Sequence, residues 1–377
     1  MTPTFWYDVA CPFAYAAALR LRERDMAWRP ILLGGLLRDL GVASDPNLAM
    51  PASKRRALRE DAVWQVGRAG RRIRLTEETP RSLGAMRLCA AAPDAVRPDL
   101  SLALWAAFWE DGRDIAEPAV LAEIAARYGL DPAMEGRDAL WASTTAARDA
   151  GVFGVPTLQV GDRLDWGADR IDADPWRPGP PLPPNGRILR VYHDFASPFS
   201  YLGVVGAAEL AAAHGRTLEL VPILLGALFR AIGTPDVPLL AFSEPRRQWS
   251  LRDLHEQAAL RGVPFRFPSR FPMRTVTAAR VALLEPAATL PIYRAAWADD
   301  RDISEPEILV EILDSAGFDG RALVDGAASS EAKLQLRANT DAARDAGVFG
   351  VPTFSVDGAL VWGQDRRARV AELMEAG

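Results

Sequence analysis

The stretch ARDAGVFGVPTFSVDG, residues 343–358, contains the features that decide the fold of this chain. Its Val-Pro-Thr leads into an apolar, strand-like segment, and Asp-Gly then favours the tight turn of a hairpin that returns through ALVWG at 359–363. The first part of the stretch, ARDAGVFGVPT, also occurs at 147–157. A segment this specific that occurs twice predicts a duplicated domain.

Other repeated blocks support the duplication. They occur in the same order in both halves, at separations of 186 to 196 residues. The pairs are WYDVACPFAY (6–15) with VYHDFASPFSY (191–201), ILLGGLLRDLG (31–41) with ILLGALFRAIG (223–233), and GRDIAEP (112–118) with DRDISEP (300–306). Between the copies, six prolines in DADPWRPGPPLPPNG (172–186) favour an extended, semi-rigid linker. The sequence therefore predicts domains at 1–171 and 188–377, joined by a linker at 172–187.

The second copy has the pattern of an α/β domain. A strand is predicted at 188–195, a helix from Ser197 to Gly215, and a second strand at 218–225. Residues 240–340 are predicted to be helical throughout, and the hairpin at 351–363 is followed by a last helix. This order predicts two thioredoxin-like domains in tandem, each with a helical insertion. In that fold the peptide bond before the proline of Val-Pro-Thr, here Pro352, is usually cis.

The composition excludes several classes of function. The 377-residue chain has a net charge of −5, and its arginines alternate with acidic residues, as in RLRERD, so nucleic acid is not an expected partner. Two cysteines and three scattered histidines predict neither a disulfide scaffold nor a metal site. The sequence shows no basic start with an apolar run and no apolar stretch that could span a bilayer, so we expect a reducing cytoplasm and no membrane.

The second half resembles 2-hydroxychromene-2-carboxylate isomerases and kappa-class glutathione transferases, which belong to the DsbA-like thioredoxin superfamily. The stretches that carry the resemblance are DFASPFSYL (194–202), VPILLGALFRAIG (221–233), RGVPFRFPSRFP (261–272), DRDISEP (300–306), RANTDAARDAGVFGVPTF (337–354) and WGQDR (362–366). The first half resembles the same family more loosely. The resemblance implies a glutathione-dependent isomerase acting on a small conjugated compound, such as one from an aromatic pathway. The glutathione thiolate would add to an electron-poor double bond, the bond would rotate or a ring would open, and the thiol would be expelled.

Ser197 is the main candidate for chemistry. It lies where a strand ends and a helix begins, and the unpaired N–H groups and dipole at such a position favour an anion. No base is near it in the sequence, so its hydroxyl is better suited to donate a hydrogen bond to a thiolate than to act as a nucleophile. The resemblance implies that it faces the glutathione sulfur. The alternative is that Ser197 is only a helix N-cap.

The resemblance assigns further glutathione contacts in the second half. They are the backbone of Val351 beside Pro352, the side chains of Gln364 and Asp365 for the γ-glutamyl end, and Arg246 in place of a family lysine. Alternatively, Pro352 only shapes the fold, and Asp365 only caps the last helix. In the family an aspartate reaches across a dimer interface, which implies that Asp253 serves the first site and Asp61 the second. The chain would then be a monomer with an internal pseudo-dimer, or a homodimer.

The first half departs from the family pattern at Cys11, which replaces the serine. Ala14 stands where a dithiol oxidoreductase needs its second cysteine, so dithiol exchange is not expected. Cys11 is either a reactive thiolate at a helix N-terminus, able to form a mixed disulfide with glutathione, or a small residue in a decayed site. Cys89 is expected to be core packing. Contacts retained from the family are Val155, Pro156, Asp169 and Lys54, whereas Ala168 replaces the glutamine.

Three other functions use the same residues. A kappa-like glutathione transferase would leave glutathione attached to its substrate. A thiol-disulfide oxidoreductase would depend on Cys11, and a binding module would have no catalysis. For either enzyme with a small-molecule substrate, an apolar pocket is expected near FRFPSRF at 265–271.

Overall fold

The computed structural model describes residues 2–43, 50–74, 76–77, 79–131, 134–171, 177–235 and 237–376. Its internal contacts divide the chain into two compact units. The N-terminal unit comprises Met1–Met50, Leu58–Pro175 and Ser243–Arg246, and the C-terminal unit comprises Pro51–Ala57, Trp176–Phe242 and Arg247–Gly377. Each unit thus takes a short segment from the other half of the sequence, and each is described by itself below.

The N-terminal unit is built on a four-stranded sheet in the order β2-β1-β3-β4. β1 (Thr4–Tyr7) is parallel to β2 (Ala27–Pro30) and antiparallel to β3 (Thr157–Val160), which forms a hairpin with β4 (Arg163–Trp166). The helices are α1 (Pro12–Leu21), α2 (Leu33–Asp39), α4 (Ala52–Gly67), α5 (Leu83–Ala91), α6 (Arg97–Trp105), the π-helical turn η1 (Ala106–Glu110), α7 (Pro118–Arg127), α8 (Arg137–Asp149) and α9 (Ala168–Ile171).

The C-terminal unit repeats this topology in a sheet of order β6-β5-β7-β8. Its strands are β5 (Ile188–His193), β6 (Thr217–Pro222), β7 (Thr353–Val356) and β8 (Ala359–Trp362). The helices are α10 (Pro198–Val204), α11 (Ala207–Ala212), α12 (Leu225–Ile232), the 3₁₀ turns η2 (Pro238–Ala241) and η3 (Pro286–Ala288), α13 (Glu244–Leu260), α14 (Val276–Leu284), α15 (Thr289–Trp297), α16 (Pro306–Ser315), α17 (Gly320–Gly326), α18 (Ser330–Asp345) and α19 (Arg367–Ala376). The two thioredoxin-like domains with helical insertions are therefore confirmed.

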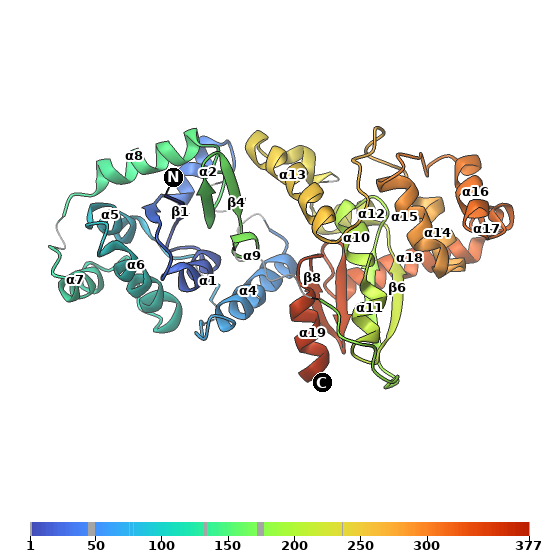
Figure 1. The fold of residues 1–377 in the computed structure, drawn as a ribbon, viewed down its shortest axis with the longest axis horizontal. Coiled ribbons are helices and arrows are strands. Elements are labelled where there is room, and N and C mark those ends of the chain that lie inside the picture. Colours follow the sequence, from blue (N-terminus) through green and yellow to red (C-terminus); the bar gives the residue numbers. More distant parts are fainter. Residues whose placement is uncertain are drawn as a thin grey trace. The chain divides into compact units, whose positions relative to one another are not determined.

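The sheet topology decides where a site can form. In Figure 1 the inserted helices α14–α17 gather on the β6 side of the C-terminal sheet, and the β7–β8 hairpin forms its other side. Because β5 and β7 are antiparallel, with Tyr192 opposite Thr353, the end of β5 lies beside the start of β7. The first turn of α10 is thereby placed next to the residues that precede β7. The hairpin turn has positive φ at Asp357 (49°) and Gly358 (91°), as its Asp-Gly sequence predicts.

The helix predicted from Ser197 to Gly215 is in fact two helices. Gly206 separates α10 from α11 with a left-handed φ of 78°, and α10 therefore ends at Val204. The guanidinium of Arg367 donates to the carbonyl oxygens of Leu202 (2.8 Å) and Val205, which the break leaves without helical partners. In the first half, α1 runs on without a break.

The insertion is also less helical than the sequence predicts. Residues 261–275 form no helix, because Gly262 has a φ of 64° and three prolines follow at 264, 268 and 272. In the linker, residues 172–176 lie outside the described residues. The described part packs onto the C-terminal unit, where Leu182 N donates to Ala212 O (2.9 Å) and Asn185 N donates to Gly215 O (2.8 Å).

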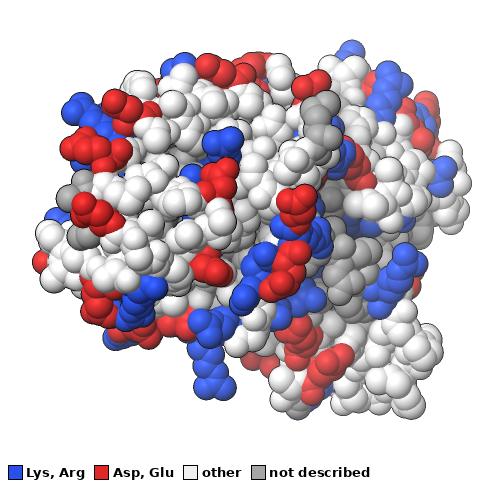
Figure 2. Space-filling model, turned by 60° about the vertical axis from the view of Figure 1, so that its left-hand side comes forward, with Lys and Arg blue, Asp and Glu red and all other residues white. Residues whose placement is uncertain are grey.

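The surface agrees with the charge pattern of the sequence. On the face drawn in Figure 2, basic and acidic side chains lie next to one another rather than in separate fields. Among the described residues, no helix is both long and apolar enough to cross a membrane. The same residues contain no group of three or more histidine, cysteine, aspartate or glutamate side chains that could hold a metal ion.

Candidate functional site

Ser197 is the N-cap of α10 and lies almost entirely within the protein, with 6% of its surface exposed. Its Oγ accepts a hydrogen bond from the backbone N of Ser200 (3.2 Å) and donates to the carbonyl oxygen of Val351 (3.4 Å). The cap interaction uses a lone pair of Oγ and leaves the hydroxyl hydrogen to donate. At 3.4 Å the hydrogen bond to Val351 O is weak, so the Ser197 hydroxyl is suited to donate to an incoming anion instead.

The residues before β7 form the opposite wall of the site. The Val351–Pro352 peptide bond is cis, as the sequence predicts. Pro352 approaches α10 closely at Gly203, where a Cβ atom would lie 2.6 Å from Pro352 Cγ. Glycine at this position therefore permits the close packing that holds Val351 beside Ser197.

Gln364 joins the site from the end of β8. It is 2% exposed, and its Cβ lies 3.7 Å from the position that a Cβ on Gly203 would occupy. Among the described residues its side-chain oxygen Oε1 has no hydrogen-bond partner. Buried acceptors are rarely left without a donor, so this atom marks a place for a ligand N–H. Asp365 follows it and forms an ion pair with Arg366 (3.1 Å).

A buried carboxylate, which sequence reasoning missed, supports the strand end that carries Ser197. Asp194 accepts hydrogen bonds from Ala196 N (3.0 Å), Leu225 N (2.7 Å) and Thr275 Oγ1 (2.7 Å). Burial raises the pKa of Asp194, and these three donors act in the opposite direction. The signal was present in the repeat, because Asp8 stands at the matching position in the first half and binds Ala10 N and Leu33 N at 2.9 Å each.

The first half keeps the geometry with a different atom. Cys11 is the N-cap of α1, and its Sγ donates to the carbonyl oxygen of Val155 (3.4 Å), which precedes a second cis proline, Pro156. Burial raises the pKa of the Cys11 thiol to about 12, although the N–H groups of Phe13 and Ala14 act to lower it. Burial therefore outweighs the helix N-terminus, and the thiol is neutral at physiological pH.

The remaining parts of this half differ more. Ala168 is buried and provides no polar group in place of Gln364. Asp169 forms an ion pair with Arg170 (2.7 Å). Cys89 is fully buried in the core, as expected, and burial raises the pKa of its thiol to about 11.

The two predicted cations lie over tryptophan rings. Lys54, within the segment that belongs to the C-terminal unit, lies 5.8 Å from the ring centroid of Trp362. Arg246, within the segment that belongs to the N-terminal unit, lies 5.4 Å from the ring centroid of Trp166. Burial lowers the pKa of Arg246 to about 10. The sequence predicted the reverse, with Lys54 at the Cys11 site and Arg246 at the Ser197 site.

The two predicted aspartates are buried on long helices. Asp61 on α4 is 6% exposed and belongs to the N-terminal unit, and Asp253 on α13 is 4% exposed and belongs to the C-terminal unit. That Asp61 contacts glutathione at the Ser197 site, and Asp253 at the Cys11 site, remains a prediction.

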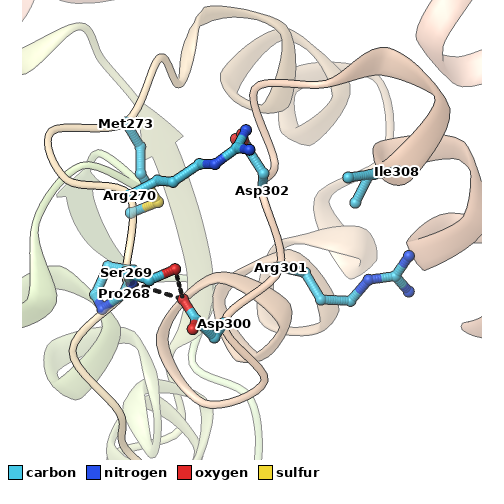
Figure 3. Close-up of a pocket in the computed structure, with 8 residues that line it drawn as sticks. All are labelled: Pro268, Ser269, Arg270, Met273, Asp300, Arg301, Asp302 and Ile308. Carbon is cyan, nitrogen blue, oxygen red and sulfur yellow. Dashed lines mark hydrogen bonds and ion pairs between the residues drawn. The ribbon is translucent and has the colours of Figure 1, made fainter.

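A cavity of about 350 Å³ lies in the C-terminal unit, partly within the stretch where a pocket was expected. Figure 3 shows Ser269 directed at Asp300 and Arg270 directed at Asp302, and these pairs lie 3.0 and 2.8 Å apart. The walls thus combine charged and apolar side chains. The phenylalanines of the stretch pack against Trp297 instead. The cavity is lined by Pro268, Ser269, Arg270, Met273, Asp300, Arg301, Asp302 and Ile308.

Comparisons with known proteins agree with the duplication. Residues 4–173 and 188–375 each match the model of the DSBA-like thioredoxin domain. A 2-hydroxychromene-2-carboxylate isomerase of Sphingobium xenophagum is 30% identical over 184 residues, which cover 48% of this chain and 94% of the relative. Human glutathione S-transferase kappa 1 is 27% identical over 216 residues, covering 52% of this chain and 92% of the relative. A solved 2-hydroxychromene-2-carboxylate isomerase, 26% identical, superposes with a TM-score of 0.46 over 50% of this chain and 95% of its own.

Proposed function

We propose that this chain, which belongs to the DSBA-like thioredoxin domain family through both of its halves, is a glutathione-dependent isomerase whose active site lies at Ser197. Two of its relatives are named as an isomerase and a glutathione transferase, so the relatives are enzymes. We infer for this chain the isomerase reaction on a small conjugated compound.

The observation that carries the proposal is the set of polar atoms around Pro352. The Ser197 hydroxyl is a donor, the Val351 carbonyl 3.4 Å away is an acceptor, and the buried Gln364 Oε1 is an acceptor with no donor among the described residues. An extended peptide that carries a thiol matches this set, because its backbone N–H groups satisfy the two acceptors and its sulfur faces the donor. Glutathione is a peptide of this kind.

When bound, glutathione would supply the sulfur nucleophile for the substrate's double bond. The task of Ser197 is to donate a hydrogen bond to that sulfur and so favour its ionised form. Ser197 has no proton acceptor other than Val351 O in the described structure, so it is a donor and not a nucleophile. We do not assign Asp194 as a base, because in the described structure its carboxylate accepts hydrogen bonds from Ala196 N, Leu225 N and Thr275 Oγ1, whereas the Ser197 hydroxyl donates to Val351 O.

Several residues are proposed to hold the peptide. We assign Gln364 and Asp365 to its γ-glutamyl end. Lys54 lies over the ring of Trp362. Because Trp362 is only two residues before Gln364, we assign the Lys54 cation to the Ser197 site. Arg246, over Trp166, is assigned with Val155, Pro156 and Asp169 to the Cys11 site. We also propose that Asp61 contacts glutathione at the Ser197 site and that Asp253 contacts it at the Cys11 site.

A kappa-like transferase is the second candidate, because the human transferase matches this chain nearly as well as the isomerase does. Both reactions begin with the same sulfur at the same serine. An oxidoreductase centred on Cys11 is disfavoured, because a thiol with a pKa of about 12 supplies almost no thiolate at neutral pH.

Calorimetric titration with glutathione tests the site. We expect the wild-type protein and Cys11→Ser to bind glutathione in the same way, and Gln364→Leu to weaken binding about tenfold through the loss of one buried acceptor. The matched control is Gln159→Leu in the N-terminal unit, which removes an amide that accepts a hydrogen bond from Trp6 Nε1 (2.9 Å). Equal binding by wild type and Gln364→Leu would refute the assignment.

Product analysis separates the two reactions. Incubation with 2-hydroxychromene-2-carboxylate and glutathione should give a product of unchanged mass if the chain is an isomerase. A product heavier by one glutathione would establish the transferase instead.

A further inference from the structure

The side chain of Arg261 joins the end of α13 to the segment that carries Gln364. Its Nη1 donates to the backbone oxygen (2.8 Å) and the side-chain Oε1 (2.9 Å) of Gln257 on α13, and its Nη2 donates to the carbonyl oxygen of Gln364 (3.3 Å). Gln257 and Gln364 are both buried, so water competes little for these acceptors. One guanidinium thus connects the helical insertion of the C-terminal unit to the residue whose Oε1 has no donor among the described residues.

The backbone on the other side of Gln364 is held by the cis proline. Gly363 N donates to Pro352 O (3.0 Å), one residue before the carbonyl that Arg261 binds. The two hydrogen bonds therefore fix the backbone before and after the Gln364 Cα atom. This fixes the direction in which the Gln364 side chain leaves the backbone, which a buried acceptor needs if it is to meet a ligand N–H.

The first half binds the equivalent glutamine with a different arginine. Gln65 on α4 corresponds to Gln257, because each lies five residues before a glycine with positive φ. Arg20, in the last turn of α1, donates to the backbone oxygen and to Oε1 of Gln65 at 2.9 Å each. Both glutamines lie in the last turn of their helices, where carbonyl groups lack helical partners, so both arginines cap a helix.

The cap is common to both halves, whereas the contact with the site is not. Ala69 stands at the position of Arg261, and Ala168 stands at that of Gln364. Among the described residues, no hydrogen bond joins Arg20 to Ala168. Capping alone is thus achieved from α1, and the half that has a glutamine at its site is the half whose arginine also reaches that glutamine.

We propose that Arg261 is a positioning residue for Gln364. By binding the Gln364 carbonyl, it keeps the buried Oε1 directed at an N–H group of the ligand peptide. Arg261 acts through Gln364 and not on the ligand itself. The ligand in this inference rests on the proposed glutathione site, whereas the effect of Arg261 on the backbone around Gln364 can be measured without it.

Two matched variants of the full chain test the role. Arg261→Met and Arg20→Met each remove a guanidinium that caps a helix, and each leaves an unbranched side chain in its place. Only the first removes a hydrogen bond to Gln364. A purely structural role predicts similar behaviour of the two variants, and a positioning role predicts a difference.

The first measurement needs no glutathione. Exchange of the Gly363 amide hydrogen with solvent, relative to the amides of the central strand β5, should become at least about fivefold faster in Arg261→Met, since the backbone beside its bond to Pro352 loses support. The ratio should stay unchanged in Arg20→Met. Comparison with β5 removes any global loss of stability. An unchanged ratio in Arg261→Met would overturn the positioning role, whether or not the protein binds glutathione.

The second measurement is the dissociation constant of glutathione by calorimetry. Arg261→Met should weaken binding about three- to fivefold, and Arg20→Met by less than about 1.5-fold. When Gln364 is already leucine, Arg261→Met should cause no further loss, because the two residues act as one unit. A full additional loss in that background would contradict action through Gln364. Failure of the wild type to bind glutathione would contradict the proposed function, and the exchange of Gly363 would then decide the role of Arg261.

Discussion

Ser197 Oγ and the carbonyl oxygen of Val351 lie 3.4 Å apart, across the gap between the first turn of α10 and the cis proline before β7. Cys11 Sγ and the carbonyl oxygen of Val155 have the same separation in the first half. A sulfur is larger than an oxygen, so the equal distance means that the first site is the tighter of the two. The duplicated backbone has therefore kept one geometry for two different side-chain chemistries.

Removal of the Ser197 hydroxyl should slow the reaction more than it weakens binding. In Ser197→Ala we expect kcat/KM for isomerisation to fall about 100-fold, the size of effect seen when one donor to a developing anion is lost. Ser197→Thr keeps the hydroxyl and serves as the control. Steady-state kinetics on both variants check this, and full activity in Ser197→Ala would rule out the hydroxyl as the donor.

Cys11 should react slowly with alkylating reagents at neutral pH. With a thiol pKa of about 12, its thiolate fraction at pH 7 is about a thousandfold below that of an ordinary exposed cysteine. The rate should then rise about tenfold per pH unit as long as the protein stays folded. Mass spectrometry of iodoacetamide labelling in Cys89→Ala isolates Cys11, and a rate that levels off near pH 7 would contradict the buried, neutral thiol.

Gly203→Ala should destabilise the protein by about 1–3 kcal/mol, because the added Cβ would lie 2.6 Å from the rigid ring of Pro352. Gly226→Ala is the matched control, since its Cβ would meet no atom within 4 Å and alanine is the better helix former. Urea unfolding of both variants tests the difference. A Gly203→Ala protein as stable as wild type would mean that α10 and Pro352 are not tightly packed.

His193 should make the C-terminal unit less stable in mild acid. Its pKa is about 3 in the folded protein, below the unfolded value of about 6.5, so the unfolded state binds more protons as the pH falls. The stability contribution is present above about pH 6.5 and is lost progressively toward pH 3.

Comparing the wild type with His193→Phe measures this pH-dependent contribution of His193 to the free energy of unfolding. Between pH 7 and pH 5, the free energy of unfolding should fall about 2 kcal/mol further in the wild type than in the variant. Urea unfolding at the two pH values gives both differences, so the variant's own stability at pH 7 does not enter. If the free energy of unfolding changed equally with pH in both proteins, His193 would have to be in contact with water rather than buried.

Local patterns predicted a large part of this molecule. The repeat ARDAGVFGVPT predicted the duplication, Asp357-Gly358 predicted the hairpin turn, and Val-Pro-Thr predicted the cis bond before Pro352. These features depend on backbone preferences of residues that are adjacent in the chain, which is why sequence alone could reveal them. The end of α10 at Gly206 was not predicted, because the Arg367 side chain that stabilises the break comes from the last helix.

The candidate site also has features that the sequence predicts and features that depend on the tertiary structure. The sequence by itself determined that Ser197 and Cys11 begin helices after a buried strand and that a cis proline follows far along the chain. Only the tertiary structure decided that burial raises the pKa of Cys11 to about 12, and that His193 and Tyr293 meet. The physical reason is that capping and turn geometry are short-range, whereas desolvation and hydrogen bonds between side chains 100 residues apart exist only once β5 and α15 pack together.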